Sequence, residues 1–390
     1  MRPLKVLQFI TPAGFYGAER WVLALANNLN HEQVTCDLAV SEEGAGQDLS
    51  LLDYYPPEAG SIHKVPMQGR FDWRAIERLA RLIKAQQVDL IHTHGYKSDI
   101  IGLLAARRAG IPCVSTPHGF SGKVGWKMGL FIRAGTFMLR FFDAVAPLSE
   151  ELVRDMARFN VPDRKVRFIR NGVDLKEIDA ALAELPEQAD SAGEGAREKE
   201  PVFTIGFIGQ MIPRKGIPEL LAVFDRLHQR RPNTRLKLVG DGNQRVELEN
   251  ITRSLASRQA IEFLGFRNDR LALLTSFDLF AMTSSLEGIP RCMMEAMACG
   301  VPVAGYEIPG VDQLLKGGKT GFSAPHRDRE ALLACFEAAM DEPGDARARA
   351  QKARALIDET YSAARMAREY EALFDQLVAG TKPARTGSRA

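Results

Sequence analysis

The stretch SSLEGIPRCMMEAMACGVPV, residues 284–303, places two glutamates on either side of a helix start. The apolar run just before it, residues 278–282, is typical of a short strand. Pro290 suits the first turn of a helix, because its missing N–H needs no partner there. Gly300 suits the helix C-terminus, and residues 301–304 are typical of the next strand. The pattern predicts strand, loop, helix and strand, with Glu287 in the loop and Glu295 in the second helical turn.

The chemistry of this stretch suits a ligand that carries phosphate and sugar together. Free amides at a helix start bind anions, and carboxylates accept hydrogen bonds from hydroxyl groups. An ordinary pair of solvated glutamates has the same spacing, so both interpretations stay open on this stretch alone.

Short apolar runs alternate with amphipathic helical patterns on both sides of this stretch. This alternation predicts an α/β fold of parallel sheets covered on both faces, with ligands at the carboxyl ends of the strands. The other predicted strands are residues 6–10, 34–40, 62–65, 88–92, 113–116, 143–148, 165–169, 203–208, 235–239 and 261–263.

The length of 390 residues is too great for one core and predicts two domains. A stretch without large apolar residues, 184–200, is the predicted linker. The predicted parts are an N-terminal domain (1–183), a C-terminal domain (201–345), C-terminal helices packing back toward the first domain (346–380) and a disordered tail (381–390).

The composition is that of an ordinary globular protein, 45% hydrophobic and 26% charged. The net charge of +2 gives no reason to expect nucleic acid as a partner. The five cysteines include no C-x-x-C pair and indicate reduced residues. The first apolar run is too short for a signal peptide, and no run is long enough to span a bilayer. We therefore expect a cytoplasmic location.

Several polar residues fall at or beyond predicted strand ends. His94, Asp99 and His118 are candidates by this position alone. His92 and His94 share a strand face, but two ligands without a third give no reason to expect a metal.

Two predicted strand-to-helix loops suit phosphate. Gly14 and Gly17 allow a close backbone approach in the first, although a plain tight turn fits equally. Arg214 and Lys215 stand in the second, beside helix amides, where two cations would neutralise a diphosphate.

Residues 100–142 contain six Lys or Arg and no Asp or Glu, with aromatic residues between the cations. Such a segment suits an anionic membrane surface. A core helix with inward aromatics and solvated cations fits the same pattern, so this too stays open.

Taken together, these motifs resemble the retaining glycosyltransferases of family 4. The resemblance covers nearly the whole chain, and its specificity comes from the order of the motifs. They are GAER (17–20), HTHG (92–95), PHG (117–119), NGVD (171–174), RKG (214–216), VGDG (239–242), FLG (263–265), EGIP with EAMACGVPV (287–303) and KTGF (319–322). Glu287 and Glu295 fill the family's E-x7-E signature.

The resemblance implies the GT-B fold, with two doubly wound Rossmann-like domains facing each other across a cleft. It implies that the N-terminal domain binds the acceptor and the C-terminal domain the nucleotide sugar. It also implies residue roles. Catalytic roles fall to Glu287, His118 and Lys215, and substrate binding to Gly17, Arg214, Lys215, Gly265, Arg267, Glu287, Gly288, Ile289 and Glu295.

In these roles Glu295 would hold the ribose and Glu287 the transferred sugar, while Lys215 would bind the diphosphate. Many members carry an Arg where this chain has Gln210, so one cation is missing unless Arg214 replaces it. No Asp-x-Asp occurs, so we expect no metal and no cofactor.

The expected reaction moves a sugar, from a UDP-sugar in preference, to a glycan or lipid-linked acceptor in envelope polysaccharide, lipopolysaccharide or glycolipid synthesis. The protein would then lie peripherally on the inner face of the membrane. Two alternatives remain: a nucleotide-sugar epimerase on the same fold, and a non-catalytic nucleotide-sugar-binding protein.

Overall fold

The computed structural model describes residues 2–12, 14–44, 46–69, 72–119, 126–184 and 202–381, with the backbone alone for 126–131 and 381. The chain divides into two compact units, Met1–Asp174 with Ala363–Ala390, and Leu175–Ser362. Each unit contains a six-stranded sheet whose neighbouring strands are all parallel. The predicted α/β architecture is confirmed.

The sheet of the first unit has the order β3-β2-β1-β4-β5-β6. The elements of this unit are β1 (Leu4–Ile10), α1 (Gly17–Asn28), β2 (Val34–Glu42), η1 (Ser50–Tyr54), β3 (Ile62–Pro66), α2 (Trp73–Ala85), β4 (Leu90–His94), α3 (Tyr96–Ala109), β5 (Cys113–Ser115), α4 (Trp126–Met138), η2 (Leu139–Phe141), β6 (Ala144–Val145), α5 (Glu150–Arg158), η3 (Asp163–Lys165) and α14 (Ala363–Thr381).

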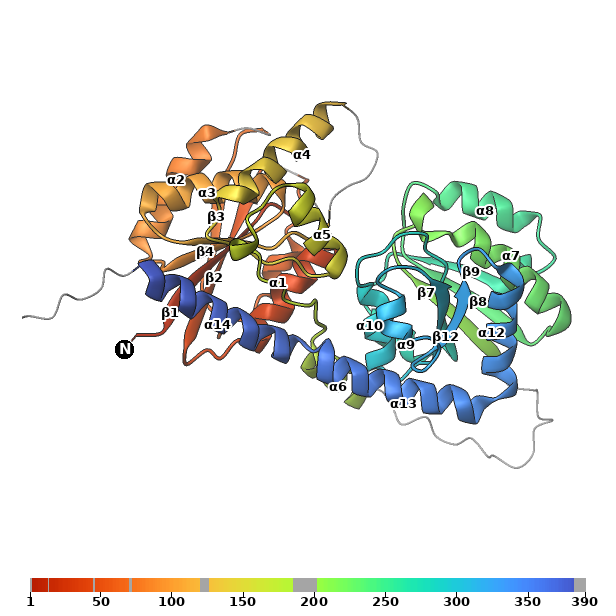
Figure 1. Cartoon of the computed structure of the whole chain (residues 1–390). Coiled ribbons are helices and arrows are strands. Elements are labelled where there is room, and N and C mark those ends of the chain that lie inside the picture. Colours follow the sequence, from red (N-terminus) through yellow and green to blue (C-terminus); the bar gives the residue numbers. More distant parts are fainter. Residues whose placement is uncertain are drawn as a thin grey trace, which may run out of the picture. The chain divides into compact units, whose positions relative to one another are not determined.

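Successive residues of β1 point to opposite faces of this sheet, as the two-residue period of a strand requires. Val6 and Ile10 join the core beneath α1 and α14, and Leu7 and Phe9 join the core beneath α2 and α3. Figure 1 shows α14 running alongside α1, although the two helices are far apart in the sequence. The C-terminal helix therefore completes one of the two cores of the first unit.

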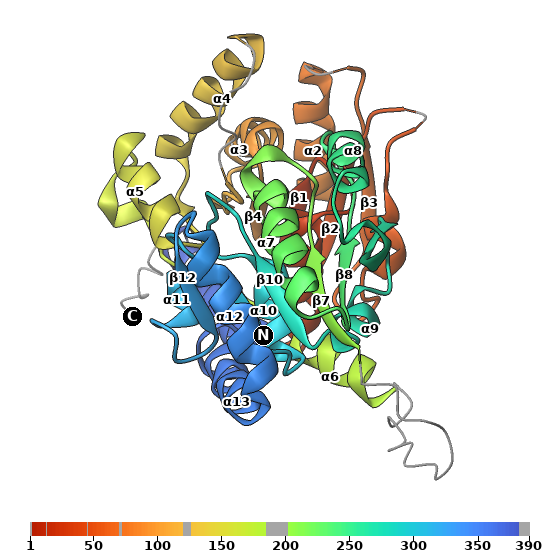
Figure 2. The same cartoon turned by 90° about the vertical axis from the view of Figure 1, so that its right-hand side faces the viewer.

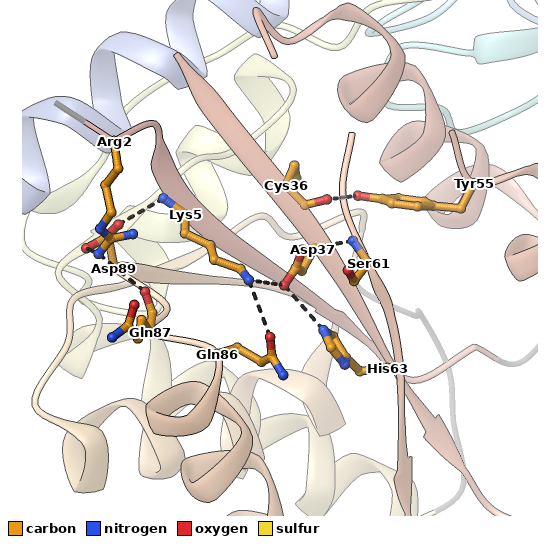
Figure 3. A network of polar contacts seen from close by, with 10 residues as sticks. All are labelled: Arg2, Lys5, Cys36, Asp37, Tyr55, Ser61, His63, Gln86, Gln87 and Asp89. Atoms are coloured by element: carbon orange, nitrogen blue, oxygen red, sulfur yellow. Dashed lines mark hydrogen bonds and ion pairs between the residues drawn. The ribbon is translucent and has the colours of Figure 1, made fainter. Parts of the chain in front are cut away.

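A buried carboxylate, Asp37 of β2, ties together the first three strands of the sheet order (Figure 3). Its oxygens accept from Lys5 Nζ at 3.0 Å and from the Ser61 backbone N–H at 2.9 Å, and His63 Nε2 lies 3.2 Å away. Lys5 Nζ also contacts Gln86 Oε1 at 3.4 Å, at the end of α2. A buried charge needs such partners, so this cluster stabilises the sheet only while it stays complete.

We therefore expect Asp37→Ala to lower the free energy of unfolding by about 3 kcal/mol, because Lys5 and Ser61 lose a buried acceptor. The matched control is Glu42→Ala, which breaks an exposed ion pair to Lys64 between β2 and β3. It should cost less than about 1 kcal/mol. Chemical denaturation of both variants measures the difference, and equal costs would contradict this role for Asp37.

The sheet of the second unit has the order β12-β11-β10-β7-β8-β9. Its elements are α6 (Leu175–Ala183), β7 (Phe203–Ile208), η4 (Pro213–Lys215), α7 (Ile217–Arg230), β8 (Thr234–Val239), α8 (Arg245–Arg253), η5 (Arg258–Ala260), β9 (Ile261–Gly265), α9 (Arg270–Thr275), β10 (Leu279–Met282), α10 (Arg291–Ala298), β11 (Val303–Glu307), α11 (Asp312–Leu315), β12 (Phe322–Pro325), α12 (Arg329–Asp341) and α13 (Pro343–Thr360). Figure 2 shows α7 and α12 side by side over the strands of this unit.

The stretch around the two glutamates folds as strand, loop, helix and strand, with small shifts at the ends. Pro290 is the residue before α10 rather than its first residue, because its ψ of 112° is extended. Gly300 follows the helix with φ +75°, as a C-terminal glycine should. β11 begins at Val303, two residues later than predicted.

The division of the chain differs from the predicted domain boundaries. The first unit ends at Asp174, and α6 already belongs to the second unit, where it contacts α9 and α10. In the C-terminal part, α13 belongs to the second unit and α14 to the first. The predicted linker was chosen because residues 184–200 lack large apolar residues. The division after Asp174 reflects instead the contacts that α6 makes with α9 and α10.

One strand prediction, residues 165–169, is wrong. This segment makes a single bridge, Val166 with Val145, instead of a strand. The predicted linker, from residue 185 on, and the tail, from residue 382 on, lie outside the described residues.

Candidate active site

Two loops at the carboxyl ends of the neighbouring strands β7 and β10 are joined by hydrogen bonds. Thr283 Oγ1 donates to the backbone oxygens of Lys215, at 3.2 Å, and Gly216, at 3.0 Å. The backbone N–H of Ser285 donates to the Arg214 oxygen at 2.8 Å, and its hydroxyl to the same oxygen at 3.2 Å. The RKG loop is thus fixed against the loop that carries Glu287.

Two glycines allow these backbones to approach so closely. Gly216 has a φ of +64°, and a Cβ atom there would overlap the carbonyl oxygen of Thr283. Gly310, in the loop after β11, has a φ of +89°, and its Cβ would overlap the carbonyl oxygen of Gly288. Any larger residue would push the loops apart, since a carbonyl oxygen of the backbone cannot rotate out of the way.

Glu287 lies at the centre of this site and is only 5% exposed. Its Oε1 is 2.5 Å from Lys215 Nζ, and its Oε2 is 3.3 Å from Arg214 Nη1. Lys215 is also buried, whereas Arg214 is half exposed and also donates to the Leu286 oxygen at 3.2 Å. One carboxylate and two cations therefore meet where an anionic ligand could replace the carboxylate as the partner of the cations.

Glu295, on α10, is held by arginines. Arg291 Nε is 2.9 Å from Oε1, one helical turn away, and Arg270 Nε is 3.3 Å from each oxygen. Arg270 also donates to Glu177 of α6 at 2.8 Å. Burial alone would lower the pKa of Arg270, but Glu295 and Glu177 outweigh it and raise that pKa, so the guanidinium stays charged and holds the Glu295 carboxylate in place.

The remaining site candidates of the second unit lie outside the ion pairs of Glu287 and Glu295. Gly265 ends β9 with φ +69°, and Arg267 is half exposed and pairs with Asp269 at 2.5 Å. Ile289 is buried beside Glu287 in the chain. Gln210 is exposed, and Arg214 is the second cation beside Glu287.

Burial raises the pKa of Cys292, on α10, to about 11, so it stays protonated near neutral pH.

Gly17 and His118 belong to the first unit. Gly17 is the first residue of α1, whose start is capped by Glu19 reaching back to the Tyr16 N–H at 3.0 Å. His118 follows β5 and lies with Nε2 3.2 Å from Nδ1 of His94 at the end of β4. Burial lowers the pKa of His118 to about 3, so its imidazole is neutral. Asp99 is buried on the other face of the sheet, where its carboxylate accepts a hydrogen bond from Thr93 Oγ1 at 2.6 Å.

Sequence reasoning missed several residues of this site. Arg291 could have been found from its four-residue spacing to Glu295, whereas Arg270 and Glu177 are distant in sequence and carry no local signal. Within the described part of the chain, no three His, Cys, Asp or Glu residues come together in a way that could hold a metal ion.

Two family models together match most of this chain. The model described as Glycosyltransferase Family 4 matches residues 15–177, and the model described as Glycosyl transferases group 1 matches residues 187–356. The second match includes Glu287 and Glu295, and also the cations Arg214 and Lys215. This chain belongs to glycosyltransferase family 4.

Named relatives of this glycosyltransferase include two bacterial enzymes. The UDP-Gal:alpha-D-GlcNAc-diphosphoundecaprenol alpha-1,3-galactosyltransferase of Escherichia coli is 28% identical over 84% of this chain and 85% of its own length. The N-acetyl-alpha-D-glucosaminyl L-malate synthase of Bacillus anthracis is 21% identical, over 78% of this chain and 79% of its own length.

The glycosyltransferase also shares its fold with solved structures. Anabaena HepE in complex with UDP and glucose has a TM-score of 0.78 at 20% identity, over 96% of this chain and 100% of HepE. This likeness confirms the predicted GT-B fold.

Proposed function

We propose that this glycosyltransferase moves a sugar from a UDP-sugar to a glycan or lipid-linked acceptor, with retention of the anomeric configuration. The observation that carries the proposal is the meeting of Glu287 with Lys215 and Arg214 beside the start of α10. The E. coli relative is named for a UDP-sugar donor and a diphosphoundecaprenol-linked acceptor, and HepE was solved with UDP and glucose. Both support a UDP-sugar donor, and the name of the E. coli relative supports a lipid-linked acceptor in envelope polysaccharide or glycolipid synthesis.

The chemistry follows from what each side chain can offer. Breaking the glycosidic bond leaves negative charge on the departing diphosphate, and fixed cations at that position lower the barrier. Lys215 and Arg214 supply the positive charge that stabilises the diphosphate, and the amides at the start of α10 add to it. The diphosphate then takes over the cations, and the Glu287 carboxylate becomes available to the sugar hydroxyl groups.

A thermal-shift screen tests the donor class. UDP, GDP and ADP at about 100 times their dissociation constants would each add about 2.7 kcal/mol if bound only by the folded state, so the base that stabilises at the lowest concentration identifies the donor. We expect UDP to do so. A larger shift with GDP or ADP at equal concentration would contradict the UDP assignment while leaving the transferase in place.

Product analysis tests the reaction itself. UDP-sugars that stabilise the protein are incubated with and without a diphosphoundecaprenol-linked sugar, and the product is examined by NMR. Transfer should require the acceptor and give the anomer of the donor. An inverted anomer would refute retention, and conversion of the donor sugar without any acceptor would indicate an epimerase.

We further propose that the acid-poor segment, residues 100–142, contacts an anionic membrane. Phe137 and Phe141 are 50% and 47% exposed, their rings lie 5.5 Å apart, and Arg140 stacks on Phe137. Phe142 is fully buried, so the aromatic residues divide between core and surface. No helix among the described residues is long and apolar enough to cross a membrane.

Part of the positive charge of this segment is balanced from outside it. Arg107 lies 3.7 Å from Asp143, and Arg108 lies 3.8 Å from Glu77. The exposed phenylalanines thus contribute to binding alongside the remaining cations, such as the exposed Arg133.

Co-sedimentation with vesicles of anionic and neutral lipids measures this contact. We expect binding to anionic vesicles that weakens at high salt, and a several-fold loss in the double variant Phe137→Ser, Phe141→Ser. Trp73→Ser is the matched control, because Trp73 is 68% exposed on α2 of the same unit but outside the segment. Equal losses in both variants, or binding that ignores lipid charge, would contradict the proposal.

A further inference from the structure

An arginine of the second unit connects Glu295 to a carboxylate on a different helix. Arg270, the first residue of α9, is 8% exposed and contacts both groups. Its Nη2 donates to Glu177 Oε1, on α6, at 2.8 Å, while its Nε lies 3.3 Å from each oxygen of Glu295. The shorter contact is the one to Glu177, so the helix α6 provides the firmer anchor of this guanidinium.

The charges within this cluster are equal in number. Arg270 and Arg291 carry two positive charges, and Glu295 and Glu177 carry two negative charges. Arg270 and Glu295 are buried, so water screens their interaction weakly. Glu177 is the member whose side chain reaches solvent, with an exposed fraction of 42%. Its removal would leave a positive charge uncompensated beside Glu295 and would free the Arg270 guanidinium to move.

The orientation of the Glu295 carboxylate decides which hydroxyl groups it can bind. A carboxylate accepts about four hydrogen bonds in fixed directions, so two neighbouring hydroxyl groups fit it in one orientation and not in others. Arg270 Nε is equally distant from both oxygens, and a contact with both oxygens restricts rotation of the carboxylate. The orientation of Glu295 therefore depends on the position of Arg270, which in turn depends on Glu177.

A second arginine fastens α6 to the same helix at a different point. Arg354, on α13, donates to the two oxygens of Asp179 at 2.8 and 3.0 Å. Its Nη1 also donates to the carbonyl oxygen of Ala298, the last residue of α10, at 2.7 Å. Asp179 and Glu177 thus both attach α6 to α10 through an arginine. They differ in what that arginine holds on α10, which is a backbone oxygen for Asp179 and the Glu295 side chain for Glu177.

We propose that Glu177 is a positioning residue of the nucleotide site: it holds the Arg270 guanidinium against Glu295, so that the Glu295 carboxylate accepts hydrogen bonds from both hydroxyl groups of the ribose. This inference rests on the proposed function, because it requires a nucleotide sugar whose ribose meets Glu295. It adds a residue of α6 that acts on the nucleotide through two other side chains.

Titration calorimetry with UDP and with dideoxy-UDP, which lacks both hydroxyl groups of the ribose, tests this role. The wild-type chain should bind UDP several-fold more tightly than dideoxy-UDP. Glu177→Ala should raise Kd for UDP roughly fivefold, the effect of about one hydrogen bond, and leave Kd for dideoxy-UDP within about twofold. Glu177→Gln keeps an oxygen acceptor for Arg270 and should recover most of the UDP affinity.

Asp179→Ala is the matched control, because it removes the other attachment of α6 to α10. It should leave Kd for UDP and for dideoxy-UDP within about twofold of the wild type, and thermal melting shows whether each variant keeps its fold. In turnover with a UDP-sugar, Glu177→Ala should raise KM for the donor roughly fivefold with kcat within about twofold, as expected for a lost contact that is equally strong in the ground state and the transition state.

The outcomes separate a positioning role from a structural one. Equal losses of affinity for UDP and dideoxy-UDP in Glu177→Ala, equal losses in Glu177→Ala and Asp179→Ala, or an unchanged Kd for UDP would each overturn the proposal while leaving the proposed function in place. A wild-type chain that binds UDP and dideoxy-UDP equally would refute the ribose role of Glu295 and this proposal with it. A wild-type chain that binds no UDP would refute the proposed donor as well.

Discussion

Glu287→Gln should abolish sugar transfer, with kcat lowered by roughly 10³-fold, while UDP binds as tightly as before or more tightly. The amide has the same volume but cannot carry the charge that the carboxylate brings to the developing positive charge of the sugar. In the free protein Glu287 holds Lys215 and Arg214, so its neutralisation releases both cations for the diphosphate. Steady-state kinetics and calorimetric titration with UDP measure the two effects independently.

Glu295→Gln is the matched control for this experiment, because it is the same substitution on a buried glutamate eight residues further on. If Glu295 holds the ribose, its variant should weaken UDP binding and raise KM for the donor more than it lowers kcat. Unchanged turnover in Glu287→Gln would remove Glu287 from the mechanism. Identical kinetics in the two variants would contradict their separate roles.

Lys215→Met should lower kcat by roughly 10² to 10³-fold and weaken UDP binding as well. Its ammonium group is the buried cation of the cluster, 2.5 Å from Glu287, and in that position it is only weakly screened by water. Without it, the diphosphate leaves with less stabilisation, and Glu287 keeps only Arg214 as a cationic partner. Rates should therefore fall most for donors whose leaving group is the most basic.

Arg214→Met provides the comparison for Lys215. Arg214 also contacts Glu287, but its side chain is half exposed, so solvent screens it and the loss of kcat should be at least several-fold smaller. Thermal melting of both variants shows whether either has lost its fold. A folded Lys215→Met variant with wild-type kcat would contradict the assignment of leaving-group stabilisation to this residue.

Much of the fold could be predicted because its physical signals are local. Apolar runs such as residues 203–208 and the glycine after α10 mark element ends directly in the sequence. The error at residues 165–169 has a different origin. An apolar run becomes a strand only when a neighbouring strand offers enough partners, and here β6 has only two residues. The division into compact units likewise depends on contacts, since α6 joins the second unit through α9 and α10.

The site was predictable to the extent that its parts lie at strand ends. Glu287 and Lys215 were found in this way, because the carboxyl ends of neighbouring parallel strands meet at one edge. Arg270 could not be found in this way, since nothing near it in the sequence indicates its pairing with Glu295.

The position of α14 has a consequence for the order of folding during synthesis. The first unit is discontinuous in the chain: it is left at Asp174 and re-entered at Ala363, whose N–H donates to the Val173 oxygen at 2.8 Å. Tyr370 and Phe374, both fully buried in its core, emerge from the ribosome only after the whole of the second unit. The second unit, being continuous, can therefore fold on the ribosome first. Until its last helix is made, the N-terminal sheet has one apolar face that α1 covers only in part.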